Sequence, residues 1–252
     1  MPFNISRHED EFVYNESVGG LATGISSLEE PKERLWCGWP GIPSDRLKKH
    51  DQTVITKELN TRGCHPVFLS SNDIRNYYSG FSNKTVWPLF HYFSELTVFE
   101  QSFWKAYKKV NQMFCDQVVK KVNKDDVIWV HDYQLMLLPA MLRERLPNAQ
   151  IGFFLHIPFP SFELLRHLPW RTEILEGMLG ADLIGFHEYD YVRHFLSSVY
   201  RICGHEHNLS NLLIEGRHIR VDAFPMGINY EKYADSHQNP DVQNEVERLK
   251  YN

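Results

Sequence analysis

Short apolar runs that alternate with longer amphipathic stretches constrain the fold of this chain more than any other feature. Four such runs lie in its second half: 127–130, 151–157, 182–186 and 219–226. Continuous apolar runs of this length are typical of strands buried on both faces. Helical periodicity marks the stretches around them: about 134–146, 162–177 and 189–203. This repetition predicts an α/β fold, a Rossmann-like parallel sheet flanked by helices and joined by right-handed crossovers.

A further helix is predicted before the first of these strands, over 94–122. Apolar and aromatic side chains recur there at three- and four-residue spacings: Phe99, Phe103, Tyr107, Val110, Phe114 and Val118. A stripe of this kind is more often core than a ligand site, so we expect these side chains to be buried.

Charge and composition exclude several classes of protein. Lys and Arg number 27 against 32 Asp and Glu in 252 residues, a net charge of −5. This balance argues against binding to nucleic acid, which favours a basic surface. No apolar run approaches the ~20 residues of a membrane span, and the N-terminus lacks the apolar core of a signal peptide. We therefore expect a cytoplasmic protein with no membrane partner.

Metal and cofactor motifs are not evident in the sequence. The four cysteines form no CxxC pair, and we expect each to serve in packing. The Cys203–His207 loop alternates possible ligands, but a solvated turn is the better interpretation because a matching ligand pair is missing. We predict neither a metal ion nor a cofactor.

Polar residues that follow the predicted strands are the first candidates for a binding site. Asp132, His156 and His187 lie at or near the ends of three successive runs. Ligands of parallel α/β sheets bind beyond the carboxyl ends of the strands, where these residues would meet. A glycine-rich segment at 17–24 precedes a helical pattern, and its backbone amides could hold an anion. A plain tight turn explains that segment equally well.

Several motifs in a fixed order give the chain a specific resemblance. They are GGLATG (19–24), WCGWPG (36–41), YY, FSN and WP within 77–88, FHY (90–92), WVHDY (129–133), GFFLHIPFP (152–160), LPWR (168–171) and GFHEYDY (185–191). In these motifs the chain resembles the trehalose-6-phosphate synthases. The resemblance implies the N-terminal domain of a retaining GT-B glycosyltransferase. The expected partners are UDP-glucose and glucose 6-phosphate, and the expected products are trehalose 6-phosphate and UDP, formed without a covalent enzyme intermediate.

The resemblance also assigns roles to individual residues. Acceptor binding is assigned to four side chains: Trp39, Tyr78, Trp87 and Asp132. Donor binding is assigned to Gly20 and His156. Asp132 and His156 are the expected catalytic pair. Other interpretations remain open at this point. Tyr78 and Trp87 could pack in the core, Asp132 could cap the following helix, and His156 could be a satisfied buried histidine.

The matching region implies a particular domain organisation. We expect an acceptor-binding domain over 1–232, with its first strand truncated, and an interdomain linker or frayed helix over 233–252. The nucleotide-sugar domain is absent from this arrangement, so the chain alone should be inactive. A non-catalytic sugar-phosphate-binding regulatory subunit is the alternative, and a different GT-B transferase ranks last. A homo-oligomer is left open.

Overall fold

The computed structural model describes residues 1–9, 11–17, 34–227 and 230–250. The chain divides into two compact units. The larger comprises Met1–Ser17 and Glu33–Pro225, and the smaller includes Met226–Asn252. The predicted domain limit at residue 232 falls inside a helix of the smaller unit and stays a prediction.

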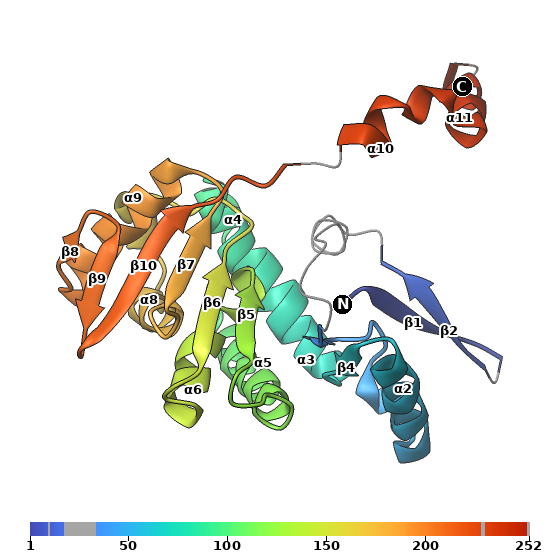
Figure 1. Ribbon diagram of the computed structural model, residues 1–252, viewed down its shortest axis with the longest axis horizontal. Coiled ribbons are helices and arrows are strands. Elements are labelled where there is room, and N and C mark those ends of the chain that lie inside the picture. Colours follow the sequence, from blue (N-terminus) through green and yellow to red (C-terminus); the bar gives the residue numbers. More distant parts are fainter. Residues whose placement is uncertain (10, 18–33, 228–229, 251–252) are drawn as a thin grey trace. The chain divides into compact units, whose positions relative to one another are not determined.

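A six-stranded sheet forms the centre of the larger unit (Figure 1). Its order is β5 (Val127–His131), β6 (Gln150–Phe154), β7 (Leu183–Phe186), β10 (Arg217–Ala223), β9 (Asn211–Ile214) and β8 (His207–Asn208). The first four strands are parallel, and they are the four apolar runs of the sequence. The α/β fold is therefore confirmed.

The sheet is not wholly parallel, however. β9 pairs antiparallel with both β10 and β8, so the sheet is mixed. The hairpin escaped prediction because β8 has only two residues, too few for a clear period. The Cys203–His207 loop leads into this hairpin. Among the described residues no group of three or more His, Cys, Asp or Glu side chains could hold a metal ion.

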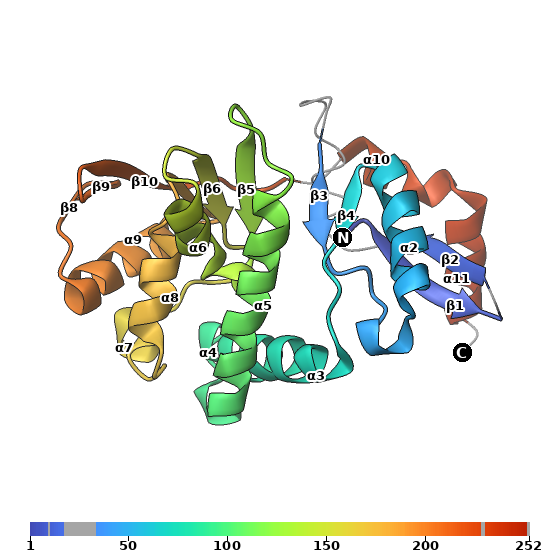
Figure 2. The ribbon, with the colours of Figure 1, turned by 90° about the horizontal axis from the view of Figure 1, so that it is seen from below.

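Helices cover one face of this sheet (Figure 2). They are α5 (Gln101–Val119), α6 (Leu138–Arg145), α8 (Arg171–Met178) and α9 (Tyr189–Ser198). The predicted stripe of α5 is buried at Tyr107, Val110 and Phe114, but Phe99 precedes the helix and is 41% exposed. The helix predicted over 162–177 is two helices, α7 (Phe162–Leu165) and α8. Pro169 lies between them, where it cannot donate to a continuing helix.

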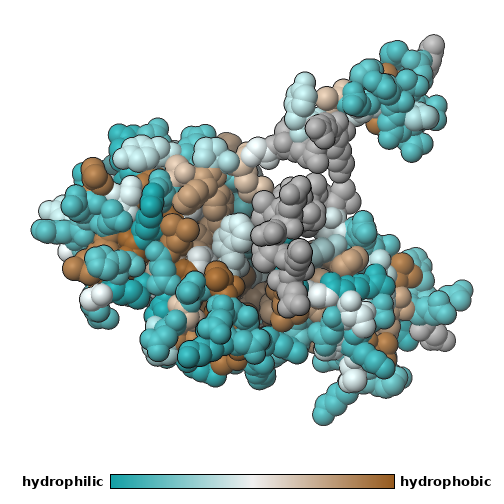
Figure 3. All heavy atoms as spheres, viewed as in Figure 1, coloured by the Kyte–Doolittle hydropathy of each residue, from teal (hydrophilic) through white to brown (hydrophobic). Residues whose placement is uncertain are grey.

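The other face of the sheet carries a mixture of apolar and polar side chains (Figure 3). On β5, Val127 and Trp129 are exposed, whereas Ile128 and Val130 are buried in the core. This alternation shows that β5 is covered on one face only, although its sequence is typical of a strand buried on both.

The remaining elements of the larger unit precede β5. The strands are β1 (Phe3–His8), β2 (Glu11–Glu16), β3 (Trp36–Gly38) and β4 (Cys64–Pro66); β1 and β2 form a hairpin, and β3 and β4 pair in parallel. The helices are η1 (Ser44–Arg46), α2 (Lys49–Thr61), α3 (Ser71–Asp73), η2 (Ile74–Val86), α4 (Trp87–Phe90) and η3 (Ser94–Leu96). The two exceptions come later in the chain: η4 (Tyr133–Leu135) after β5, and η5 (Val199–Cys203) directly after α9.

The described part of the smaller unit is mostly helical. It contains α10 (Tyr230–Ala234), η6 (Ser236–Gln238) and α11 (Pro240–Lys250), so most of the predicted linker is regular helix. Within the described residues, no helix combines the length and apolar character needed to cross a bilayer.

Candidate active site

Asp132 has an unusual backbone conformation at the carboxyl end of β5. Its φ is +73° and its ψ is 171°, a region that is essentially restricted to glycine. A non-glycine residue held there costs about 1–3 kcal/mol, and such residues cluster at functional sites. The Asp132 amide donates to the carbonyl of Phe154 on the neighbouring strand at 2.7 Å, which holds the strained residue in place.

The Asp132 carboxylate is bound through one oxygen. Oδ1 accepts hydrogen bonds from the backbone amides of Tyr133 (3.0 Å) and His156 (3.2 Å). The predicted capping role is thus present, although the capped element is the short helix η4. Within the described part of the chain Oδ2 has no hydrogen-bond partner, and it is not among the fully buried unpaired atoms. One carboxylate oxygen is therefore left for a ligand.

Burial also changes the acidity of this carboxyl. Desolvation raises the pKa of Asp132 to about 6, and the two backbone hydrogen bonds only partly oppose the increase. A carboxyl with this pKa is ionised at neutral pH, but burial of the ionised form destabilises the folded protein. Such perturbed groups are common in functional sites.

Three imidazoles form a cluster at the ends of β5, β6 and β7. Nδ1 of His131 and Nε2 of His156 are 3.1 Å apart, and the rings of His156 and His187 have centroids 5.5 Å apart. Burial lowers the pKa of His131 to about 4 and that of His156 to about 3, with the neighbouring histidines adding to the shift in His156. Both rings are neutral at pH 7.

The contact between two neutral rings couples their tautomers. If His131 donates from Nδ1, His156 carries its own proton on Nδ1 and can donate to a ligand from there. If His156 donates from Nε2, its Nδ1 can only accept. His131 therefore decides which kind of hydrogen bond His156 offers.

A π-helix brings the two predicted phosphate ligands to one side. Tyr78 is in η2, and Trp87 follows nine residues later at the start of α4. An α-helix has 3.6 residues per turn, so nine residues would place the two side chains on opposite faces. The i→i+5 bonds of η2 give roughly four to five residues per turn, so nine residues make about two turns.

The burial pattern agrees with this winding. Buried side chains in the segment recur at four- or five-residue spacing: Tyr77, Phe81, Thr85, Val86 and Phe90. Tyr78 and Trp87 are 39% and 41% exposed, and Asn83 between them is also exposed. The core interpretation of Tyr78 and Trp87 is therefore not what the structure shows.

Asn83 and Tyr133 connect this helix face to Asp132. The Tyr133 hydroxyl donates to Oδ1 of Asn83 at 2.9 Å, and Tyr133 is the residue directly after Asp132. Trp39 extends the group, because its ring centroid lies 6.2 Å from that of Tyr78. The indole N–H of Trp39 donates to the carbonyl of Ile42, which leaves only its ring face for contact with a ligand.

Trp87 is oriented by its own neighbour. Its ring stacks on His91 with centroids 4.0 Å apart, and Nδ1 of His91 lies 2.7 Å from the Trp87 carbonyl. This stacking limits the rotation of an otherwise exposed indole.

Helix α5 supports these elements from the core. The buried hydroxyl of Tyr107 donates to the carbonyl of Tyr133 at 2.8 Å and accepts from the amide of Met136 at 3.0 Å. Gly80 permits the close approach of η2 and α5, since a Cβ there would lie 2.7 Å from Cδ1 of Phe103. The loop after β5 is thus held in place by contacts within the protein, without a bound ligand.

The predicted site residues can now be placed. Trp39, Tyr78, Asp132 and His156 belong to one connected group, and Trp87 lies on the same helix face as Tyr78. Gly20 and most of the glycine-rich segment lie outside the described residues. Their roles in binding stay predictions.

Sequence reasoning missed two members of the group. Asn83 links the helix face to the strand end, and its place five residues after Tyr78 and four before Trp87 was the available signal. His131 contacts His156, and its position one residue before Asp132 in a strand end was the signal there.

Comparison with known proteins identifies the class. The glucose 6-phosphate complex of a UDP-forming trehalose-phosphate synthase from Burkholderia xenovorans is 30% identical, with a TM-score of 0.77 over 93% of this chain and 53% of that one. The N-terminal domain of a trehalose-6-phosphate phosphatase from Candida albicans is 34% identical, with a TM-score of 0.78 over 92% of this chain and 50% of that one. The fold is therefore the Rossmann-like N-terminal domain of a GT-B glycosyltransferase.

The sequence comparisons define the family within this class. The profile of Glycosyltransferase family 20 matches residues 1–252, and the chain belongs to that family. A UDP-forming α,α-trehalose-phosphate synthase from Candida albicans is 44% identical over 99% of this chain and 53% of its own length. The chain thus spans about half the length of this curated relative.

Proposed function

We propose that this chain supplies the acceptor site for glucosyl transfer from UDP-glucose to glucose 6-phosphate, which yields trehalose 6-phosphate and UDP. One observation carries the proposal. Trp39, Tyr78, Asn83 and Asp132 from three separate segments form a connected group whose free polar atoms are neutral donors or carboxylate oxygen. This combination suits a sugar with many hydroxyl groups. The relative from Burkholderia xenovorans, with the same fold, was solved with glucose 6-phosphate.

The exposed helix face is suited to the acceptor phosphate. The phenol of Tyr78 and the indole N–H of Trp87 donate without adding charge. Oδ2 of Asp132 accepts from a hydroxyl of the sugar, because Oδ1 is already occupied. The ring face of Trp39 lies against the carbon skeleton.

The histidine pair is suited to the donor glucose. With pKa values of about 4 and 3, His131 and His156 are weak bases at neutral pH, whereas an efficient general base has a pKa near the working pH. His156 therefore orients the donor by a hydrogen bond. We further propose that the sugar is transferred with retention and without a covalent intermediate, the departing phosphate oxygen taking the acceptor proton. The protein then contributes positioning and electrostatic stabilisation.

Isothermal titration with glucose 6-phosphate tests the acceptor site. We expect Tyr78→Phe to weaken binding by about tenfold or more, since hydrogen bonds to charged groups contribute about 1.5–3 kcal/mol. Trp87→Ala should weaken it similarly. Tyr189→Phe is the matched control, because Tyr189 is 62% exposed and lies outside the group. Fructose 6-phosphate should bind more weakly than glucose 6-phosphate. Unchanged affinity in both site variants would contradict the assignment.

We expect no UDP release from this chain alone when both substrates are present. The group offers neutral side chains and one carboxylate, none of which can neutralise a departing diphosphate. A coupled assay for UDP measures this directly, and sustained release would refute the expectation.

A non-catalytic sugar-phosphate-binding subunit is the second candidate. The Candida albicans neighbour favours it, because the same fold occurs there as the N-terminal domain of a phosphatase. Saturation-transfer NMR separates the two candidates. In the transferase, UDP-glucose protons should receive magnetisation when glucose 6-phosphate is present, and His156→Ala should abolish the effect. In a purely regulatory subunit, only glucose 6-phosphate signals should respond.

A further inference from the structure

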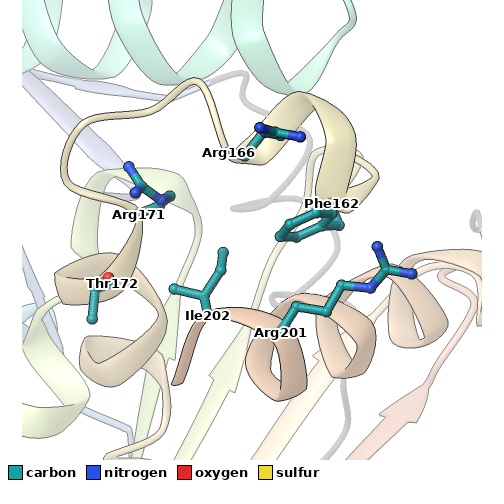
Figure 4. A pocket seen from close by; sticks show the side chains of 6 residues that line it. All are labelled: Phe162, Arg166, Arg171, Thr172, Arg201 and Ile202. Carbon is teal, nitrogen blue, oxygen red and sulfur yellow. The ribbon is translucent and has the colours of Figure 1, made fainter. Parts of the chain in front are cut away.

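A cavity of about 460 Å³ lies apart from the candidate active site and shares no residue with it (Figure 4). Its volume is within the range of small-molecule sites, about 300–1,000 Å³. Elements α7, α8 and η5 supply its walls, and six side chains line it: Phe162, Arg166, Arg171, Thr172, Arg201 and Ile202. Half of these side chains are arginines, which is unusual for a cavity in an acidic protein.

The lining arginines outnumber the carboxylates that pair with them. Glu163 lies 3.4 Å from Arg166 and 3.6 Å from Arg201, so one carboxylate is shared by two guanidinium groups. Arg171 donates to the carbonyl of Leu168 at 3.2 Å, and within the described part of the chain no carboxylate lies at ion-pair distance from it. Three cations and one anion leave a net charge of +2. A phosphate monoester carries about −1.5 to −2 at neutral pH and matches it.

The arginines lie at different sides of the open space. Figure 4 shows Arg171 on one side of the cavity, Arg166 above the Phe162 ring, and the Arg201 guanidinium beyond that ring, directed away from Arg171. The guanidinium carbons of Arg201 and Arg166 lie 4.8 Å and 5.9 Å from the centroid of that ring. Stacking of this kind restricts long side chains before a ligand arrives. Planar guanidinium groups then bind phosphate oxygens through paired N–H donors.

The rest of the lining suits an organic group. Phe162 and Ile202 present apolar surface, and Thr172 in the first turn of α8 adds a hydroxyl. Inorganic phosphate alone would leave this surface without a contact. The combination of a dipositive end and an apolar wall therefore points to an ester rather than to the bare ion.

We propose that this cavity binds a small phosphate monoester, with its phosphate held by Arg166, Arg171 and Arg201 and its carbon skeleton against Phe162 and Ile202. The site is distinct from the proposed acceptor site and does not depend on it. A ligand bound here would stabilise the contact between η5 and the start of α8, since both carry phosphate-binding residues.

Isothermal titration with inorganic phosphate, adenosine monophosphate and glucose 6-phosphate tests this site. The titration uses the whole chain carrying Tyr78→Phe and Trp87→Ala, so that the proposed acceptor site does not contribute. Adding Arg171→Gln should weaken binding of all three by about tenfold or more, and adding Arg201→Gln should weaken it further. Arg171→Lys should give an intermediate loss, because it keeps the charge without the paired donors.

Arg193→Gln is the matched control. Arg193 is an exposed arginine on α9 that pairs with Asp190 and does not line the cavity. Equal losses in Arg193→Gln and Arg171→Gln would indicate general surface attraction and overturn the proposal, as would unchanged phosphate affinity in the Arg171→Gln variant. Thermal unfolding of each variant confirms that the fold is kept.

Comparing the three probes identifies the kind of ester. Tighter binding of adenosine monophosphate than of inorganic phosphate supports a nucleotide, and tighter binding of glucose 6-phosphate supports a sugar phosphate. Equal affinity for all three overturns the role of Phe162 and Ile202. Loss of all binding already in the Tyr78→Phe, Trp87→Ala background would mean that the acceptor site is the phosphate site, and would overturn this inference while supporting the proposed function.

Discussion

Replacing Asp132 by asparagine should make the protein more stable. Burial raises the pKa of this carboxyl from 3.8 to about 6, so at neutral pH the folded protein carries an ionised group that it disfavours. Each pKa unit corresponds to about 1.4 kcal/mol, and a shift of about two units gives a cost of about 3 kcal/mol at pH 7. Asparagine removes the charge and keeps an oxygen for the amides of Tyr133 and His156.

The gain should depend on pH in a defined direction. A raised carboxyl pKa means that the folded state binds the proton more tightly, so the group's contribution to stability falls as pH rises from 3.8 through about 6. At pH 4.5 most of the Asp132 carboxyl is protonated in the folded state, and the advantage of Asp132→Asn should shrink to about 1 kcal/mol. The backbone strain at residue 132 is the same in both proteins and cancels.

Urea unfolding followed by tryptophan fluorescence at pH 7 and pH 4.5 measures both values. Asp125→Asn is the control, because Asp125 is exposed in the turn before β5. Asp132→Asn should also bind glucose 6-phosphate more weakly, since an amide nitrogen or oxygen replaces the free carboxylate oxygen of Asp132. A variant that is no more stable at pH 7, or whose gain is the same at both pH values, would refute the argument from burial.

Three further predictions concern the supporting structure. Lowering the pH from 7 to 4.5 should reduce the free energy of unfolding by about 2–3 kcal/mol through His131. The pKa of His131 falls from 6.5 to about 4 on folding, so at pH 4.5 the unfolded chain binds a proton that the folded ring does not. In urea unfolding at the two pH values, His131→Asn should therefore lose about 2–3 kcal/mol less than the unchanged protein. Gly80→Ala should destabilise by about 1–3 kcal/mol, because its Cβ would meet the Phe103 ring, and Phe103→Leu should restore part of the loss in the same assay. Tyr107→Phe should cost about 1–3 kcal/mol by leaving the amide of Met136 unpaired, and unchanged thermal stability would contradict this account.

The sequence predicted the central sheet because four of its strands coincide with continuous apolar runs. Runs at 127–130, 151–157, 182–186 and 219–226 all became neighbouring parallel strands. Boundaries were less accurate, since periodicity alone does not show where a helix is interrupted. Pro169 separates α7 from α8 inside one predicted helix, and Ser94–Leu96 forms a separate turn before α5.

The candidate site was predictable only in part. Ligands of parallel α/β sheets bind at strand ends, which marked Asp132, His156 and His187 as candidates, but the roles of Asp132 and His156 came from the resemblance. Tyr78 and Trp87 came from the resemblance, because an α-helical reading of their spacing would have separated them. Asn83 and His131 join the group through contacts between distant segments, and the only local signals were their places beside the predicted residues.

Two local departures from favourable backbone structure coincide at this site. Asp132 adopts a conformation that glycine would adopt without strain, and η2 winds as a π-helix although α-helix is the more stable default. Each departure has a geometric result, because the first aims a carboxylate at the end of β5 and the second turns Tyr78 and Trp87 to one side. The buried Tyr107 hydroxyl holds the loop after β5 in this arrangement. The strained conformation of Asp132 therefore adds a physical argument for the proposed binding role of these residues, because strained backbone clusters at functional sites.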